Sequence, residues 1–211
     1  MTWPSTLSGA LDHYGLVAVF AFVALEAAGV PLPGETILVL AGGYAGHAGH
    51  LWVGWVLAVA IAAAVLGDNA GYLVGRFGGW PLLRRYGRFV RVDESHLKVG
   101  RYLFAQHGGR VVLGGRFVSV LRTYAAFLAG VNHMPWGRFL AWNCAGGAVW
   151  ATAWTGASYL FGSHIADLPT WAQYALGAVV LLAVVGTTVL VRQRWTSLRG
   201  RAEAAYPGPL R

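Results

Sequence analysis

Five ionisable side chains lie inside stretches of sequence that are otherwise apolar. They are Glu26, Glu35, Asp68, Arg116 and Arg122. On membrane-insertion scales a charge at the bilayer centre costs roughly 2.5–3.5 kcal/mol. Five such charges in one chain therefore indicate that these residues have a role. We expect the acids to pair with the arginines, because an unpaired buried charge tends to become neutral. An ion-pair network with a purely structural role is the alternative.

The arginines are suited to binding a phosphate group. A guanidinium group stays charged and can hold phosphate through two parallel hydrogen bonds. Arg116 and Arg122 are two turns apart if their segment is helical, and lie on either side of a hairpin tip if it is not. Glu35 and Thr36 begin the second half of one expected hairpin, and Thr123 is placed to cap that of the other. Half-helix N-termini add positive potential, so we predict that these five residues bind an anionic substrate.

Three acids are candidates for proton coupling. A carboxyl group held away from water can exchange a proton near neutral pH, and this predicts a proton-carrying role for Glu26, Glu35 and Asp68. The histidines lack the spacing of a metal site, and no Ser-His-Asp grouping is evident. We therefore expect no metal, no cofactor and no enzymatic activity.

The composition is that of an integral membrane protein. Of 211 residues, 56% are hydrophobic and only 11% are charged, whereas soluble domains carry about 25% charged residues. The net charge is +8, but most arginines fall between Arg76 and Arg110 or after Val191, beside apolar stretches. That clustering is typical of loops next to a membrane, so we expect no nucleic-acid partner.

Three stretches are long and apolar enough to cross a bilayer, which takes about 20 residues. They are 51–75, 136–161 and 171–191. Basic residues follow the first stretch and fill a tail at 192–211, which predicts that the C-terminus is cytoplasmic. An N-terminal segment, 1–15, precedes the apolar region, and an amphipathic helix is expected at 93–106 on the cytoplasmic surface.

Two further apolar segments are interrupted. The first, 16–46, contains the run from Gly29 to Glu35 with two prolines, and the second, 109–132, contains the two arginines. Because Pro and Gly clusters break helices, we predict re-entrant hairpins, which need surrounding protein or a water-filled cavity. The alternatives are a kinked helix followed by a short one for the first segment, and a spanning helix with arginines reaching the interface for the second.

The two halves of the chain resemble each other. The sequence at 70–75 resembles that at 157–162, and the Leu-Ala-Gly motif at 40–42 recurs at 128–130. Each half is then a hairpin followed by a spanning helix, in inverted topology, as in many secondary transporters. The predicted fold is an all-α integral membrane protein built as this inverted repeat, with a further C-terminal transmembrane helix and the amphipathic helix.

The sequence contains motifs that resemble those of the DedA family, whose members contain a VTT domain. The matching residues are Leu25, Glu26, the run from Pro31 to Thr36, the run from Gly67 to Tyr72, Gly75, Arg76, the run from Gly115 to Phe117, Arg122, Thr123, the run from Leu128 to Gly130, Phe139, Asn143, Gly146 and Trp150. The match covers 16–191, which we interpret as one membrane domain. The resemblance implies two facing re-entrant hairpins and acid–arginine pairs needed for activity, here Glu26, Glu35, Arg116 and Arg122.

The resemblance also implies a function in the bacterial plasma (inner) membrane. Members of the family are implicated in recycling the carrier lipid undecaprenyl phosphate, in pH tolerance and, in eukaryotic relatives, in phospholipid scrambling. We expect a proton-coupled lipid transporter (flippase) for undecaprenyl phosphate or a related phospholipid, with membrane lipids, lipid phosphate and protons as partners. A homo-oligomer is left open.

The alternatives are a proton-coupled antiporter of small cations or drugs and a passive phospholipid scramblase. The chain departs from the family pattern at Ser119 and Ala126, where prolines are usual.

Overall fold

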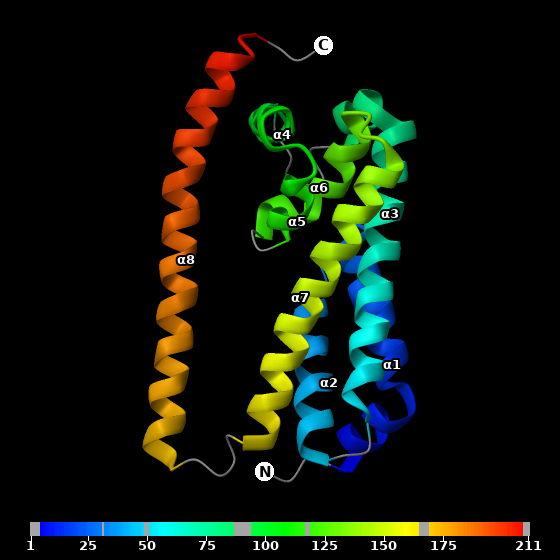
Figure 1. Cartoon of the computed structure of the whole chain (residues 1–211), viewed down its shortest axis with the longest axis vertical. Helices are drawn as coiled ribbons and strands as arrows, with labels where there is room; N and C mark the ends of the chain where they lie inside the picture. The colour runs from blue at the N-terminus through cyan, green and yellow to red at the C-terminus, as the bar shows by residue number, and fades with distance from the viewer. Residues whose placement is uncertain are drawn as a thin grey trace.

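The computed structural model describes residues 5–30, 32–48, 51–86, 94–116, 119–164 and 169–208. Within these ranges all regular structure is helical and no strand occurs, in agreement with the all-α prediction. The helices are α1 (Ser5–Ala27), α2 (Gly34–Ala48), α3 (Val53–Tyr86), α4 (Glu94–His107), α5 (Arg110–Gly115), α6 (Ser119–Val131), α7 (Trp136–His164) and α8 (Thr170–Ala205). Figure 1 shows α1, α2, α3, α6 and α7 gathered in one bundle.

The first interrupted segment folds into two helices that pack on each other. Helix α1 ends in a turn at Gly29, whose φ of 106° is a conformation that glycine adopts without strain. The N–H groups of Gly29 and Val30 each donate, over 3.0 Å, to carbonyls in the last turn of α1, which satisfies acceptors that a helix end leaves open. The chain then turns back, and α2 contacts α1. The segment is therefore a helical hairpin.

The second interrupted segment also contains two helices. Helix α5 ends at Gly115 and α6 begins at Ser119, and the two contact each other. Two helices thus occupy 109–132, even though Ser119 and Ala126 replace the prolines usual at these positions. Phe117 and Val118, at the expected tip, lie outside the described residues.

Each hairpin packs against the long helix of the other half. Helix α2 lies along α7, α6 lies along α3, and α3 contacts α7. The glycines of the recurring Leu-Ala-Gly motif make both approaches close. A Cβ at Gly42 would overlap the Ser158 hydroxyl of α7, and one at Gly130 would overlap the Tyr72 carbonyl of α3. The motifs that recur in sequence therefore occupy reciprocal positions, where small residues let helices approach.

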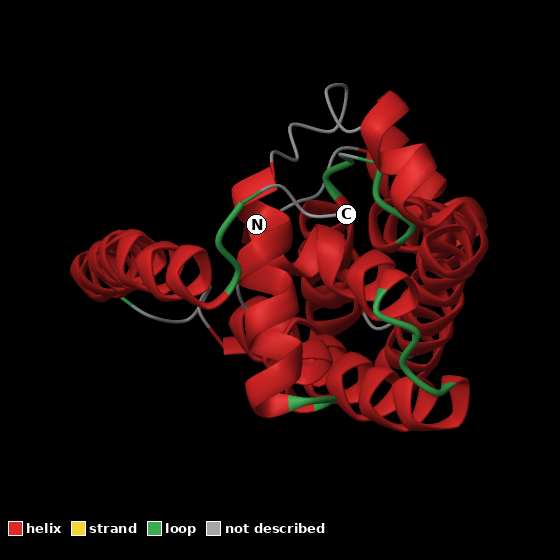
Figure 2. Ribbon diagram, turned by 90° about the horizontal axis from the view of Figure 1, so that it is seen from above, coloured by secondary structure: helices red, strands yellow, loops and turns green. Residues whose placement is uncertain are grey.

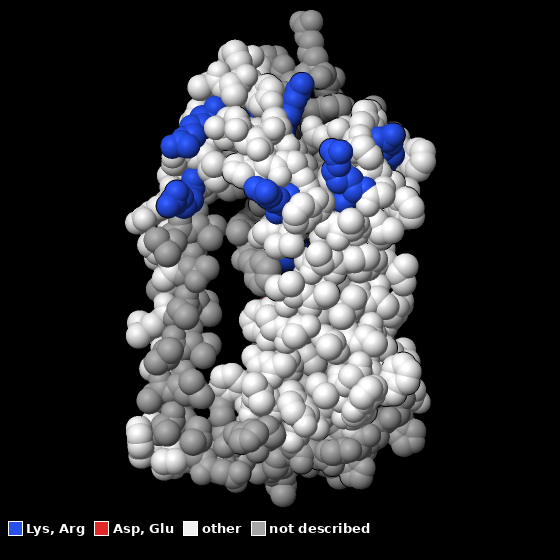
Figure 3. All heavy atoms as spheres, viewed as in Figure 1, with Lys and Arg blue, Asp and Glu red and all other residues white. Residues whose placement is uncertain are grey.

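The remaining helices lie at one side of the bundle and at its basic end. Helix α8 contacts α4, and from above it stands to one side of the other helices (Figure 2). Helix α4 corresponds to the amphipathic helix expected at 93–106, although Asp93, the first residue of that range, lies outside the described residues. Lysines and arginines gather at the end of the molecule where α4 lies and α8 ends (Figure 3).

The predicted membrane spans fall within long helices. The stretches at 51–75, 136–161 and 171–191 correspond to α3, which begins at Val53, and to α7 and α8, and all three helices continue beyond the expected ends. Among the described residues, one helical stretch, Val53–Gly78, is long and apolar enough to cross a membrane by length and composition. Tyr14–Ala27 of α1 is a shorter apolar stretch.

Candidate functional site

Arg122 of α6 joins the two halves of the molecule through a forked ion pair. Its Nη2 donates to Oε1 of Glu26 at the end of α1, and its Nη1 donates to Oε1 of Glu35, 2.5 Å away in the first turn of α2. The Arg122 Cζ lies 5.7 Å from the ring centroid of Trp150 on α7, within the range of a cation–π contact. Four helices therefore meet at one guanidinium group.

The turn between α1 and α2 brings the two glutamates to the same arginine. Glu26 stands before the turn and Glu35 after it. At Gly34 the backbone of α2 comes so close that a Cβ would overlap the Glu26 carboxylate and lie 3.3 Å from the Phe22 carbonyl oxygen. The absence of a side chain at Gly34 thus leaves the space that the Glu26 carboxylate occupies.

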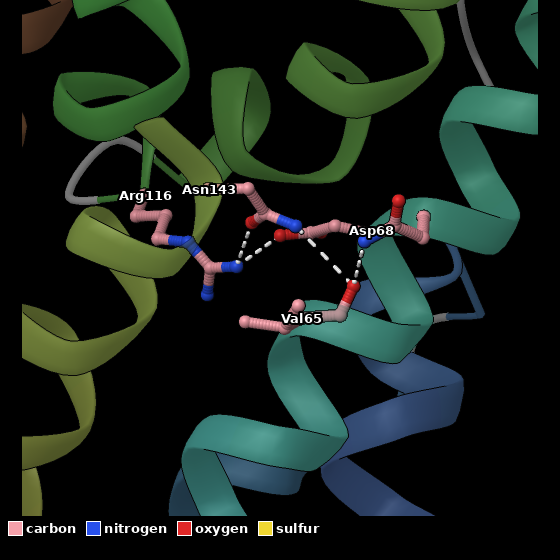
Figure 4. Close-up of polar contacts among 5 residues, drawn as sticks. Val65, Asp68, Arg116 and Asn143 are labelled. Carbon is pink, nitrogen blue, oxygen red and sulfur yellow. Dashed lines mark hydrogen bonds and ion pairs between the residues drawn. The ribbon is translucent and has the colours of Figure 1, made fainter. Parts of the chain in front are cut away.

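A second cluster forms around Arg116, which directly follows α5. Its Nη2 donates to Oδ2 of Asp68 on α3 and to Oδ1 of Asn143 on α7, the latter over 2.6 Å. Asn143 Nδ2 in turn donates to the Val65 carbonyl oxygen over 3.2 Å (Figure 4). The Arg116 and Asp68 side chains are only 6% and 7% exposed. The surrounding protein therefore shields the Arg116–Asp68 ion pair almost completely from solvent.

The two clusters open onto one narrow cavity. It measures about 10 Å³, which is space for about one water molecule. Two donors of residues that line it, Nε of Arg116 and Nε1 of Trp150, are buried without a hydrogen-bond partner in the described part of the chain. Buried donors normally have a partner, so both donors have unused hydrogen-bonding capacity. The lining consists of Val23, Glu26, Ala27, Ala64, Asp68, Arg116, Arg122 and Trp150.

The charges of the two clusters nearly balance. Three carboxylates face two guanidinium groups, so the formal sum is −1 when all are ionised. Each arginine is already bound by at least one acid, as expected for charges removed from water. An added anion would therefore have to displace a carboxylate or bind after one has been protonated. An added proton would bring the sum to zero.

The other two predicted binding residues are Thr36 and Thr123. Thr36, in the first turn of α2, is exposed, and the Glu35 side chain beside it is 43% exposed. The Thr123 side chain lies outside what the structure describes, so its predicted role in binding stays a prediction. Of the seven predicted site residues, the five charged ones come together around the cavity or its immediate neighbours.

Two contributors were not predicted as site residues. Asn143 lies in the stretch 136–161, and its side chain donates to the Val65 carbonyl of α3 and accepts from Arg116. Trp150 is one of ten tryptophans, and nothing in its spacing marks it as the ring beside Arg122. The described residues contain no group of three or more His, Cys, Asp or Glu side chains that could hold a metal ion.

Comparisons with known proteins agree with the sequence resemblance. A model of the VTT domain matches residues 32–160. An uncharacterized membrane protein of Synechocystis sp. is 45% identical over 181 residues, which is 83% of each chain. An uncharacterized membrane protein of Mycobacterium tuberculosis is 35% identical over 201 residues, 90% of this chain and 88% of that protein. Protein DedA of Escherichia coli is 29% identical over 169 residues, 80% of this chain and 77% of its own length. No solved structure is significantly similar to the chain.

Proposed function

The chain belongs to the DedA family of VTT-domain membrane proteins, and on that premise we propose that it is a proton-coupled transporter of an anionic lipid. The substrate class is a lipid with a phosphate headgroup, with undecaprenyl phosphate or a related phospholipid as the first candidate. The proposed location is the bacterial inner membrane, which α3, α7 and α8 span. The hairpins α1–α2 and α5–α6 are re-entrant, and the basic end, with the C-terminus, is cytoplasmic.

The observation that carries the proposal is the sharing of Arg122 between Glu26 and Glu35. A carboxylate and a phosphate oxygen are alternative acceptors for the same guanidinium donors. When Glu26 or Glu35 takes up a proton, its bond to Arg122 weakens and one edge of the guanidinium group becomes available. Proton uptake and headgroup binding are then two halves of one exchange at Arg122.

The cavity and its unmatched donors support this exchange. A space of about 10 Å³ holds a water molecule but no phosphate headgroup, so substrate binding requires the two hairpins to separate. Arg122 is the charged link between the hairpins, and loosening its ion pairs favours that separation. The unpartnered Nε of Arg116 and Nε1 of Trp150 are then available to an incoming phosphate oxygen.

The test is transport in reconstituted vesicles with labelled lipid, following exposure of the headgroup on each side. We expect wild-type protein to move a lipid phosphate faster when a pH gradient is imposed, and Arg122→Ala to abolish this. Arg199→Ala, at an exposed ion pair with Glu203, is the control with the same loss of charge. Unchanged transport in an Arg122→Ala protein that inserts and unfolds like the wild type would sink the role assigned to Arg122.

A second candidate is a proton-coupled antiporter of small cations or drugs. The excess of one carboxylate over the guanidinium groups favours it, because a cation can balance that charge as a proton does. Substrate-driven proton flux without lipid movement would support the antiporter over the lipid transporter. Lipid exchange that ignores the pH gradient would instead identify a passive scramblase.

A further inference from the structure

A larger pocket lies at the basic end of the molecule, separate from the cavity between the ion-pair clusters. Its volume is about 330 Å³, at the lower end of the range of small-molecule sites. It is formed by the end of α4, the turn between α6 and α7, the first turn of α7 and the residue after α8. Its lining shares no residue with that of the inner cavity. The lining residues that matter most are Arg101, Phe104, Asn132, His133, Arg138 and Tyr206.

The polar lining of this pocket is suited to an anion. Arg101 and Arg138 contribute two permanent positive charges, and both side chains are exposed. No acidic residue is among the residues that line the pocket. Arg138 also lies in the first turn of α7, where N–H groups have no intrahelical acceptor and the helix dipole is positive. In contrast with Arg116 and Arg122, neither of these arginines has an acid as its neighbour in the lining.

The floor of the pocket is held in place by the turn between α6 and α7. His133 adopts a φ of 54°, and the N–H groups of His133 and Met134 donate to α6 carbonyls over 2.9 and 3.0 Å. This is the glycine-type helix ending, here made by a histidine. The Tyr72 hydroxyl donates to the Met134 carbonyl over 2.6 Å, and Tyr72 stacks on Phe139 with ring centroids 4.5 Å apart. The turn is therefore fixed to α3 and α7.

Aromatic and apolar residues complete the lining of the pocket. A Cβ at Gly109 would overlap the Trp142 ring, so the turn after α4 lies directly on α7. Arg101 Cζ lies 4.8 Å from the ring centroid of Tyr206, a cation–π contact that holds the guanidinium group in the lining. Phe104 adds an apolar surface. Such a mixture of two arginines and aromatic rings suits a charged group carried on an apolar or glycerol-like stem.

We infer that this pocket binds a phosphate-type anion, supplied either by the headgroup of a lipid in the adjacent leaflet or by free phosphate. Basic pockets at the cytoplasmic side of membrane helices are suited to lipid headgroups. Guanidinium groups from α4 and α7 would hold the phosphate between them, and the first turn of α7 would add N–H donors. The inference rests on the proposed membrane orientation for the lipid source, but it does not depend on transport at Arg122.

The test compares two probes on the full-length protein in nanodiscs. Inorganic phosphate is titrated in nanodiscs of phosphatidylcholine alone, and retained phosphatidylglycerol is counted by native mass spectrometry from mixed phosphatidylcholine–phosphatidylglycerol nanodiscs. The pocket variant is Arg101→Gln/Arg138→Gln. Its matched control is Arg76→Gln/Arg110→Gln, which removes the same charge from two exposed arginines outside the pocket. Arg138→Gln alone replaces the double variant if that protein unfolds at a lower temperature than the control.

We expect the pocket variant to bind at least one probe roughly tenfold more weakly, since it loses charge-assisted hydrogen bonds, while the control binds as the wild type does. Loss confined to phosphatidylglycerol identifies a lipid headgroup site, and loss of both probes or of phosphate alone identifies a site for the free anion. Equal binding of both probes by the pocket and control variants would overturn the inference. Arg122→Ala should leave this binding unchanged, which separates the pocket from the proposed transport site.

Discussion

The two arginines on either side of the α5–α6 break differ in how completely their surroundings hold them. Arg116 and Asp68 are 6% and 7% exposed, and Asn143 provides a further acceptor. Arg122 is 16% exposed, and its partner Glu35 is 43% exposed. Arg116 is bound by long helices of both halves, α3 and α7, whereas Arg122 is bound by carboxylates on either side of the α1–α2 turn. We infer that the Arg116 cluster maintains the packing of the halves and that the Arg122 cluster is the one that changes.

The largest expected effect is on stability and belongs to the Arg116 cluster. Asp68→Ala leaves a buried guanidinium group without its carboxylate, and breaking a buried pair in this way costs about 3–5 kcal/mol. We expect a large fall in the thermal unfolding midpoint of the purified protein. The measurement is unfolding in detergent or nanodiscs, monitored by circular dichroism.

The control for this prediction removes both charges. Asp68→Ala/Arg116→Met carries no unpaired charge and should recover much of the lost stability, since replacing a buried ion pair by apolar groups is often neutral. If Asp68→Ala unfolds at the wild-type temperature, Arg116 does not depend on this carboxylate. The difference drawn between the clusters would then disappear.

The next effect concerns transport and belongs to the Arg122 cluster. Arg122→Lys keeps the charge but loses the fork that binds two carboxylates, because an ammonium group is a single point of charge. We expect the transport rate to fall by at least roughly tenfold, the equivalent of one charge-assisted hydrogen bond. Labelled-lipid transport in vesicles measures it. A lysine variant as active as the wild type would show that charge alone, without the fork, is sufficient.

A smaller and more selective effect is expected for the two glutamates. Glu26→Gln replaces a carboxylate by a neutral group of the same shape and so imitates the protonated site. Transport by this variant should continue but lose part of its dependence on the pH gradient. The measurement compares transport rates with and without an imposed gradient, in the variant and in the wild type.

Glu35→Gln is the matched variant at the more exposed partner. Because the Glu35 side chain is 43% exposed against 13% for Glu26, solvent screens its charge more, and we expect a weaker change in pH dependence. A larger change at Glu35 than at Glu26 would reverse the assignment, making Glu35 the principal proton carrier.

The sequence was sufficient to predict the charged residues of the site but not their pairing. Charges inside apolar segments are visible without any structure, and Glu26, Glu35, Asp68, Arg116 and Arg122 all take part in buried or partly buried ion pairs. Which acid binds which arginine depends on the α1–α2 turn and on how α6 packs against α3. These are contacts between distant segments, and no local pattern encodes them.

In the rest of the fold, too, local features were predictable from the sequence and contacts between distant segments were not. The helix breaks follow from Gly and Pro chemistry or from charges in an apolar run, so both interruptions were predictable. The recurring Leu-Ala-Gly motif indicated a repeat, but its lying against the opposite half is a matter of tertiary packing. Trp150 and the pocket beside Arg101 and Arg138 draw on helices far apart in sequence. The spacing of residues along the sequence predicts neither of them.

The smallest expected effect tests whether burial, and not the presence of an ion pair, separates these clusters from ordinary surface pairs. Arg199 and Glu203 lie one helical turn apart on α8, with Nε and Oε1 3.1 Å apart and side chains 52% and 51% exposed. Such exposed pairs contribute about 0.3–0.5 kcal/mol, so Arg199→Gln should leave the unfolding midpoint and lipid transport near wild-type values. Circular dichroism and the vesicle assay, run beside Asp68→Ala, measure both. If Arg199→Gln lowered the unfolding midpoint as much as Asp68→Ala, stability would depend on ion pairing itself and not on burial. The contrast between buried and exposed pairs would then no longer explain why Arg116 is held so firmly.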